Sequence, residues 1–182
     1  NYKNSVNEVR QYLKTLTGFK SINIVERKTN YYIEKNIIDG VTEIINRYGK
    51  IIVLEDDGVT ARNFLNFMND ALDFYELKEK VMHIATFTFI KMSENYNKTF
   101  LWSYSENTGG GWGTWKNRWN KFVWFQNEKE GLSTLTDEQR NEIEMDGDFK
   151  CLGSLRANPI PWDICWNIAI IRNDGLAVNS PV

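Results

Sequence analysis

The chain has 182 residues, of which 42% are hydrophobic and 25% are charged, the usual mixture of one globular domain with a sizeable core. Its formal net charge is −2 at pH 7 and both signs are interspersed, so no basic patch and no nucleic-acid partner are expected. The two cysteines are too few for a disulfide framework, and the apolar runs are too short to predict a segment that crosses a membrane.

The first half of the chain alternates between helical and strand-like patterns. Apolar residues recur at helical spacing over residues 6–16, 33–48 and 64–75, which predicts three helices. Strands are predicted over residues 21–26, 51–54 and 81–89, of which 51–54 is a continuous apolar run. This alternation predicts an α/β fold in which a mainly parallel sheet is flanked by helices.

The second half is less regular. Residues 100–104 are predicted to form a strand and residues 107–111 a glycine-rich loop. Helices are predicted over residues 115–124, 136–145 and 162–171. No internal repeat or linker interrupts the pattern, so residues 1–182 are interpreted as a single domain.

An acidic triplet, Glu55-Asp56-Asp57, follows directly after the predicted strand 51–54. Ligands of open α/β sheets bind beyond the carboxyl ends of the strands. Three adjacent carboxylates repel one another unless a cation or hydrogen-bond donors compensate, and oxygen ligands suit Mg²⁺ or Mn²⁺. The alternative is a solvated acidic turn, but the position after a buried strand favours a metal-assisted site for a substrate diphosphate.

Three segments carry a resemblance to a known family: residues 51–57, the stretch 111–119 and the segment 162–166. Together they resemble GT-A glycosyltransferases, and most closely the N-acetylglucosaminyltransferase I-like group and related bacterial sugar transferases. The first is the apolar strand with its acidic triplet, which resembles the donor-site segment of that family. The second is the Gly-Trp-rich stretch 111–119, and the third is the Trp-Asp segment 162–166. The resemblance implies a GT-A-like, Rossmann-like fold and a metal-dependent transfer of a sugar from a nucleotide-diphosphate donor to a carbohydrate hydroxyl, with inversion.

The resemblance also implies roles for residues around the donor. Asp57 would bind the divalent cation, Mn²⁺ or Mg²⁺, and Asp56 and Glu55 would contact the ribose or the donor sugar. Gly111 and Trp112 would lie beside the donor sugar, with the Trp112 ring stacked on it. The glycines at 109–111 fit either a loop that closes over the donor or a plain turn.

By the same resemblance, Asp163 would act as the general base on the acceptor hydroxyl. An inverting transfer needs such a base opposite the departing nucleoside diphosphate. The alternative is a carboxylate that only stabilises the start of the helix 162–171. The other tryptophans at helical spacing are expected in the core, as is His83: Trp115, Trp119, Trp162 and Trp166.

The sequence departs from the family at both ends. Nothing matches the N-terminal strands that build the nucleotide pocket in relatives, or the tail that follows position 179, so the chain is expected to be a fragment. The strand 51–54 is therefore expected to have an edge that is not paired with residues 22–25.

Two other functions remain open from the sequence. One is a nucleotidyltransferase acting on sugar phosphates, which uses related sheets and acidic metal sites. The other is a non-catalytic carbohydrate-binding domain, for which the seven tryptophans would be suitable. The resemblance implies a cytoplasmic or membrane-associated protein in bacteria, or a Golgi lumenal one in a eukaryote.

Overall fold

The computed structural model describes residues 2–86, 98–103, 110–147 and 150–180. The chain divides into two compact units, Asn1–Tyr32 and Ile33–Val182. All the described strands and all the predicted site residues belong to the second unit.

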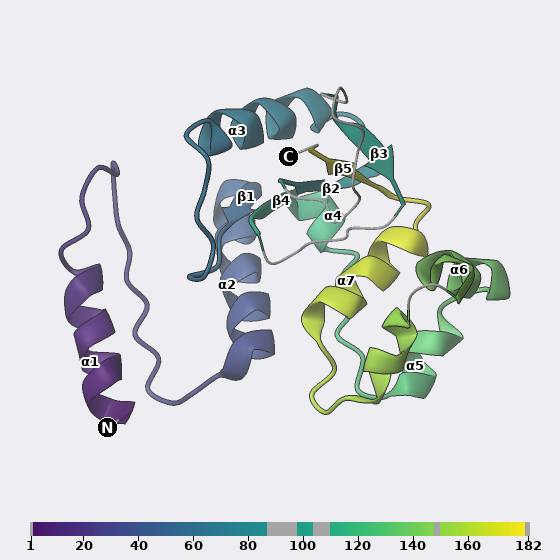
Figure 1. The fold of residues 1–182 in the computed structure, drawn as a ribbon, viewed down its shortest axis with the longest axis horizontal. Helices are drawn as coiled ribbons and strands as arrows, with labels where there is room; N and C mark the ends of the chain where they lie inside the picture. The colour runs from purple at the N-terminus through teal and green to yellow at the C-terminus, as the bar shows by residue number, and fades with distance from the viewer. Residues whose placement is uncertain (1, 87–97, 104–109, 148–149, 181–182) are drawn as a thin grey trace. The chain divides into compact units, whose positions relative to one another are not determined.

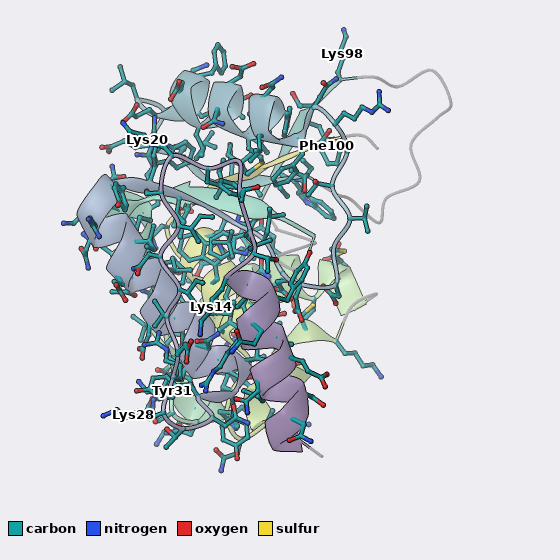
Figure 2. The ribbon with its side chains drawn as sticks, turned by 90° about the vertical axis from the view of Figure 1, so that its left-hand side faces the viewer. Lys14, Lys20, Lys28, Tyr31, Lys98 and Phe100 are labelled. Atoms are coloured by element: carbon teal, nitrogen blue, oxygen red, sulfur yellow. The ribbon has the colours of Figure 1, made fainter. Side chains whose placement is uncertain are left out.

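The first unit contains the helix α1 (Tyr2–Leu13) followed by extended chain. The Arg10 guanidinium donates a hydrogen bond of 2.9 Å to the carbonyl of Arg27 and pairs with Glu26. Lys28 and Tyr31 lie at the end of the extended segment (Figure 2). The strand predicted over residues 21–26 is wrong, since this segment pairs with no described strand and leaves Ile22 and Val25 exposed.

The second unit is built on a five-stranded sheet in the order β1-β4-β2-β5-β3. The strands are β1 (Lys50–Val53), β2 (Val81–Ala85), β3 (Phe100–Trp102), β4 (Trp112–Trp115) and β5 (Leu176–Asn179). Among the described strands, only β2 and β5 pair in parallel. The prediction of a mainly parallel, Rossmann-like sheet is therefore wrong.

The reason for this error is the strand β4. It pairs antiparallel with both β1 and β2, so those two strands run in the same direction but do not touch. The alternation of helices and strands correctly indicated that common direction. It could not reveal the antiparallel strand between them, because the residues of β4 have the pattern of a loop that leads into a helix over 115–124. Only one turn of that helix forms, α4 (Lys116–Trp119).

Three predicted helices agree closely with the structure. They are α2 (Tyr32–Tyr48), α3 (Phe64–Tyr75) and α7 (Trp162–Ile171). The predicted helix 136–145 is α6 (Asp137–Ile143), which begins after a capping box between Thr136 and Gln139. The structure adds α5 (Glu128–Ser133) and the 3₁₀ helices η1 (Met145–Gly147) and η2 (Cys151–Arg156).

Helices cover both faces of the sheet. Figure 1 shows α3 on one side, and α2, α4 and α7 on the other. Leu72 and Met68 of α3 pack on one face with Trp115. On the opposite face Trp112 packs with Trp166 of α7 and Ile45 of α2. Alternation along β4 therefore sends its two tryptophans into different cores.

The helix α7 separates two of the hydrophobic cores. Its residues Trp166 and Ile170 pack toward the sheet. Its residues Ile164 and Ile168 pack instead with Leu155 and other side chains from α5, α6 and η2. Because α7 is apolar around its whole circumference, it must be covered on all sides, as expected of a helix in the middle of a core.

The strand β1 lies at one end of the sheet. Within the described part of the chain its only strand neighbour is β4.

Two glycines provide a test of this packing. A Cβ on Gly113 would lie 3.0 Å from the carbonyl oxygen of Ile51 and 2.9 Å from the Met68 methyl group, whereas a Cβ on Gly40 in α2 would meet nothing within 4 Å. Gly113→Ala should therefore lower the free energy of unfolding by about 1–3 kcal/mol. Gly40→Ala should raise it by about 0.5–1 kcal/mol, because alanine favours the helix. Urea unfolding of both variants measures the two signs, and a neutral Gly113→Ala would contradict the register of β1 and β4.

Candidate functional site at the end of the sheet

One row of paired residues crosses the sheet where β1, β2 and β5 end. Val53 pairs with Trp112, Trp112 with Ala85, and Ala85 with Asn179. Since β1, β2 and β5 run in the same direction, their carboxyl ends meet at this edge of the sheet. The acidic triplet begins two residues after Val53 and therefore leaves the sheet at this edge.

Glu55 is the half-buried member of the triplet, whereas Asp56 and Asp57 are exposed. Burial raises the pKa of the Glu55 carboxyl, and the negative charges of Asp57, Asp56 and Asp163 raise this pKa further. The fold thus brings Asp163 into the electrostatic range of a triplet that is far from it in the sequence.

Asp163 lies in the first turn of α7 and is half-buried. Its Oδ1 accepts a hydrogen bond of 2.8 Å from the backbone N–H of Ile164. Burial is the main cause that raises the pKa of the Asp163 carboxyl; the backbone hydrogen bonds act against it, and the charge of Glu34 adds to it. Asp163 therefore accepts a hydrogen bond from the first turn of α7 and also acts electrostatically on the triplet. The geometry is compatible with a general base and with a carboxylate that only stabilises the helix start.

Gly111 lies directly against Leu54, the residue before the triplet, and against Phe64 of α3. A Cβ at this position would lie 2.8 Å from the Phe64 ring and 3.1 Å from the Leu54 side chain, and the φ angle of Gly111 is +113°. Both the close approach and the left-handed backbone require glycine. The Thr86 hydroxyl donates a hydrogen bond of 2.9 Å to the Gly111 carbonyl and fixes the entry into β4. Gly109 lies outside the described residues, so the loop prediction is described only at its end.

Trp112 does not present a ring to a ligand. The side chain is fully buried. Its ring stacks with His83 at 5.5 Å and with Trp162 at 5.3 Å between centroids. The expected stacking of Trp112 on a donor sugar is therefore wrong, because neighbouring rings and the core cover its surface. Trp112 instead supports Trp162, the residue that precedes Asp163.

The other aromatic predictions for the core are confirmed. The four remaining tryptophans in question are at most 4% exposed: Trp115, Trp119, Trp162 and Trp166. His83 is also buried, and its Nδ1 accepts a hydrogen bond of 3.0 Å from the indole of Trp166.

Two residues at this end of the sheet were not identified from the sequence. Glu34, in the first turn of α2, is close enough to Asp163 to raise its pKa. Asn179 is fully buried at the end of β5, and its Oδ1 has no hydrogen-bond partner in the described part of the chain. Glu34 carried only the signal of an acid at a predicted helix start, and Asn179 carried none, because β5 itself was not predicted.

The side chains at this end of the sheet provide only some of the ligands that a hard divalent cation needs. Within the described residues, no group of three His, Cys, Asp or Glu side chains is arranged to hold a metal ion. Mg²⁺ and its relatives are often held by one or two carboxylates together with water and substrate phosphates. The exposed carboxylates of Asp56 and Asp57 fit that kind of shared coordination.

A sizeable cavity lies elsewhere in the second unit. Its volume is about 610 Å³, it is surrounded by α5, α6, η1 and η2, and none of its lining residues belongs to the acidic triplet or to α7. The cavity and the acidic triplet therefore lie in different parts of the second unit. The candidate site residues are identified by their charges and by their position at the end of the sheet. Cys165 is not a candidate nucleophile, because burial raises the pKa of its thiol to about 11.

No protein-family model, no curated protein and no solved structure matches this chain. In the described part of the chain, no helix has the length and apolar character needed to cross a membrane.

The raised pKa of Glu55 predicts a pH-dependent effect on stability. A carboxyl whose pKa is higher in the folded state destabilises the fold when it ionises. The free energy of unfolding is therefore highest below the unfolded-state pKa and decreases as the pH rises through the folded-state pKa. Glu55→Gln should therefore raise the free energy of unfolding at pH 7 in metal-free buffer. The gain should disappear below about pH 4, where the wild-type carboxyl is neutral in both states.

The control for this prediction is Glu43→Gln, which removes an exposed carboxylate from α2. Urea unfolding at a series of pH values from acid to neutral measures both variants. A Glu55→Gln variant that loses stability at pH 7, or matches the control at every pH, would contradict the electrostatic coupling at this site.

Proposed function

We propose that this protein is a metal-dependent glycosyltransferase that moves a sugar from a nucleotide-diphosphate donor to a carbohydrate hydroxyl. The observation that carries the proposal is geometric: Trp162, the residue before Asp163, stacks on Trp112, and Trp112 pairs with Val53, two residues before the acidic triplet. The charge of Asp163 also raises the pKa of Glu55. The two segments stand out separately in the sequence, one for the donor and one for the acceptor. Their meeting at one edge of the sheet supports a single reaction centre.

In this proposal the donor diphosphate lies beside Asp56 and Asp57. Two exposed carboxylates repel a diphosphate unless a divalent cation lies between them, so donor binding depends on the cation. When bound, the cation supplies charge neutralisation for the departing nucleoside diphosphate. Gly111 lets the backbone pack directly against Phe64 and against Leu54, the residue before the triplet.

Asp163 supplies the base on the acceptor side. Its carboxylate takes the proton of the acceptor hydroxyl while the oxygen forms a bond to the anomeric carbon and the bond from that carbon to the diphosphate breaks. Burial raises the pKa of Asp163, so its carboxylate holds a proton more strongly than an exposed one. A carboxylate that holds a proton more strongly is a better base for proton removal from an alcohol.

The burial of five tryptophans is an argument for a transferase over a non-catalytic carbohydrate-binding domain. Such domains use exposed aromatic rings, whereas the five tryptophans of the two Trp-containing segments are at most 4% exposed. Core packing on both faces of the sheet accounts for them. No observation favours a nucleotidyltransferase over a glycosyltransferase.

The cation assignment predicts the behaviour of Asp57→Asn. This variant should keep its fold and bind a nucleotide-sugar donor at least about tenfold more weakly in the presence of Mn²⁺, because the cation loses a carboxylate ligand. Calorimetric titration of UDP-sugars and GDP-sugars with and without Mn²⁺ measures the effect. Asp70→Asn, which removes an exposed carboxylate from α3, is the matched control and should bind as the wild type does. Unchanged Mn²⁺-dependent affinity in Asp57→Asn would refute the assignment.

The base assignment predicts a different result for Asp163→Asn. Turnover should fall by roughly 10²–10⁴-fold while donor affinity stays nearly constant, since the amide cannot accept the proton. The side-chain oxygen of asparagine can still accept the hydrogen bond from Ile164, so the helix start is preserved. A variant with near-normal turnover would leave Asp163 as a helix cap only.

A further inference from the structure

The cavity between α5, α6, η1 and η2 has the dimensions of a ligand site. Its volume of about 610 Å³ lies within the usual range of pockets for small molecules. The assigned reaction centre does not use it. The class of ligand that fits the cavity therefore depends on the residues that line it.

The charges around the cavity are balanced. The lining contains three cationic and three anionic side chains: Arg140, Lys150 and Arg156, and Glu128, Glu144 and Asp146. A site for a diphosphate or another polyanion would carry an excess of positive charge. The balance favours a ligand without net charge that can both donate and accept hydrogen bonds.

Several of these groups are held in place. The Arg140 guanidinium donates to the Leu132 carbonyl at 2.7 Å and to Asp137 at 3.1 Å. Glu144, four residues later, accepts a hydrogen bond of 2.6 Å from the backbone N–H of Leu152. At the opposite wall Arg156 pairs with Glu128 at 2.9 Å. Arg140 and Glu144, one helical turn apart, are therefore each held by hydrogen bonds of their own.

The two groups have complementary functions toward a sugar. A carboxylate accepts hydrogen bonds on both oxygens and a guanidinium only donates them. Neighbouring hydroxyls of a pyranose can donate to Glu144 and accept from a cation of the lining at the same time. Leu132 and Leu152 provide the apolar contacts that the C–H face of a sugar ring requires. A neutral saccharide is the ligand class that uses all of these features.

We propose that this cavity is a saccharide subsite that holds a neutral sugar unit of the acceptor. This proposal rests on the proposed function for the identity of that saccharide as the acceptor. The helices α6 and η2 pack against α7, and the first turn of α7 carries Asp163. One buried helix therefore contacts the elements of the cavity wall and also carries the proposed base.

Gly153 provides a way to close the cavity without disturbing the core. It lines the cavity, and a Cβ added there would meet nothing within 4 Å. The probes are the neutral disaccharides lactose, maltose and cellobiose, and inorganic pyrophosphate as the polyanion. Titration of the ¹⁵N-labelled protein with each probe reports binding by the backbone N–H signals of residues around the cavity.

At least one disaccharide should shift the signals of Arg140, Asn141 and Gly153 in a saturable manner, with a Kd on the order of 1 mM. Gly153→Trp should abolish these shifts and Gly153→Ala should retain them. If no disaccharide shifts them, or if pyrophosphate does so instead, the subsite is refuted.

A second pair of variants covers the case in which Gly153→Trp does not fold. Glu144→Gln keeps an oxygen for the Leu152 N–H but loses the charge, and should weaken disaccharide binding at least about fivefold. Glu138→Gln lies on the exposed face of the same helix, outside the cavity lining, and should have no effect. Equal affinities in these two variants would overturn the proposal.

The outcome is separable from that of the proposed function. If saccharides shift the signals at the cavity but the protein turns over no nucleotide sugar, the saccharide site is supported and the transferase function is refuted. If the protein is a transferase and its KM for the acceptor is unchanged in Gly153→Trp, the proposed function is supported and the subsite is refuted. Hydrolysis of the donor in the absence of acceptor should be unaffected by Gly153→Trp, because the cavity does not contact the acidic triplet.

Discussion

The burial of α7 on all sides is the constraint on which the rest of the second unit depends. Nearly every residue from Trp162 to Ile171 is buried, and the helix separates the core beneath the sheet from the core formed with α5, α6 and η2. Full burial of one large apolar side chain contributes about 1.5–3 kcal/mol, so a helix with this sequence cannot be left exposed on either face. Asp163, at its first turn, is the exception that reaches the edge of the core.

The aromatic residues connect this helix to the sheet. Trp112 of β4 stacks with Trp162 and lies close to Trp119 and Trp166. Aromatic pairs of this kind add about 0.5–1.5 kcal/mol each beyond the burial of their area. The indole N–H groups of Trp119 and Trp166 are satisfied by Thr42 and His83. The result is a rigid connection between the strand that approaches the acidic triplet and the helix that carries Asp163.

Sequence reasoning succeeded where one local pattern determines an element. The helices α2, α3 and α7 have a clear helical period, and the strand β1 is a short continuous apolar run. All four were located within about one residue. It failed where pairing with strands distant in the sequence determines the secondary structure. The four residues of β4 carry two tryptophans three positions apart, a spacing that a helix would also produce. Only the partners β1 and β2 make this segment a strand.

The candidate site shows the same division. The position of Glu55, Asp56 and Asp57 after an apolar strand was sufficient to place them at the end of the sheet. Their proximity to Asp163 was implied by resemblance and is visible only through the fold. The burial of Trp112 could not be predicted, because it depends on His83 and Trp162, which approach from other elements. The cavity lining likewise comes from four short helices, two of which are 3₁₀ turns without a recognisable pattern.

The most direct test of the proposed reaction centre is to locate a bound Mn²⁺–nucleotide complex by NMR. The paramagnetic ion broadens backbone signals near it, so a titration of the ¹⁵N-labelled protein with Mn²⁺ in the presence of UDP, and separately GDP, maps its position. Broadening should require the nucleotide and be centred on Glu55, Asp56 and Asp57, with weaker effects at Gly111 and at the first turn of α7. Broadening centred on another part of the molecule, or none with either nucleotide, would contradict the assignment of this site.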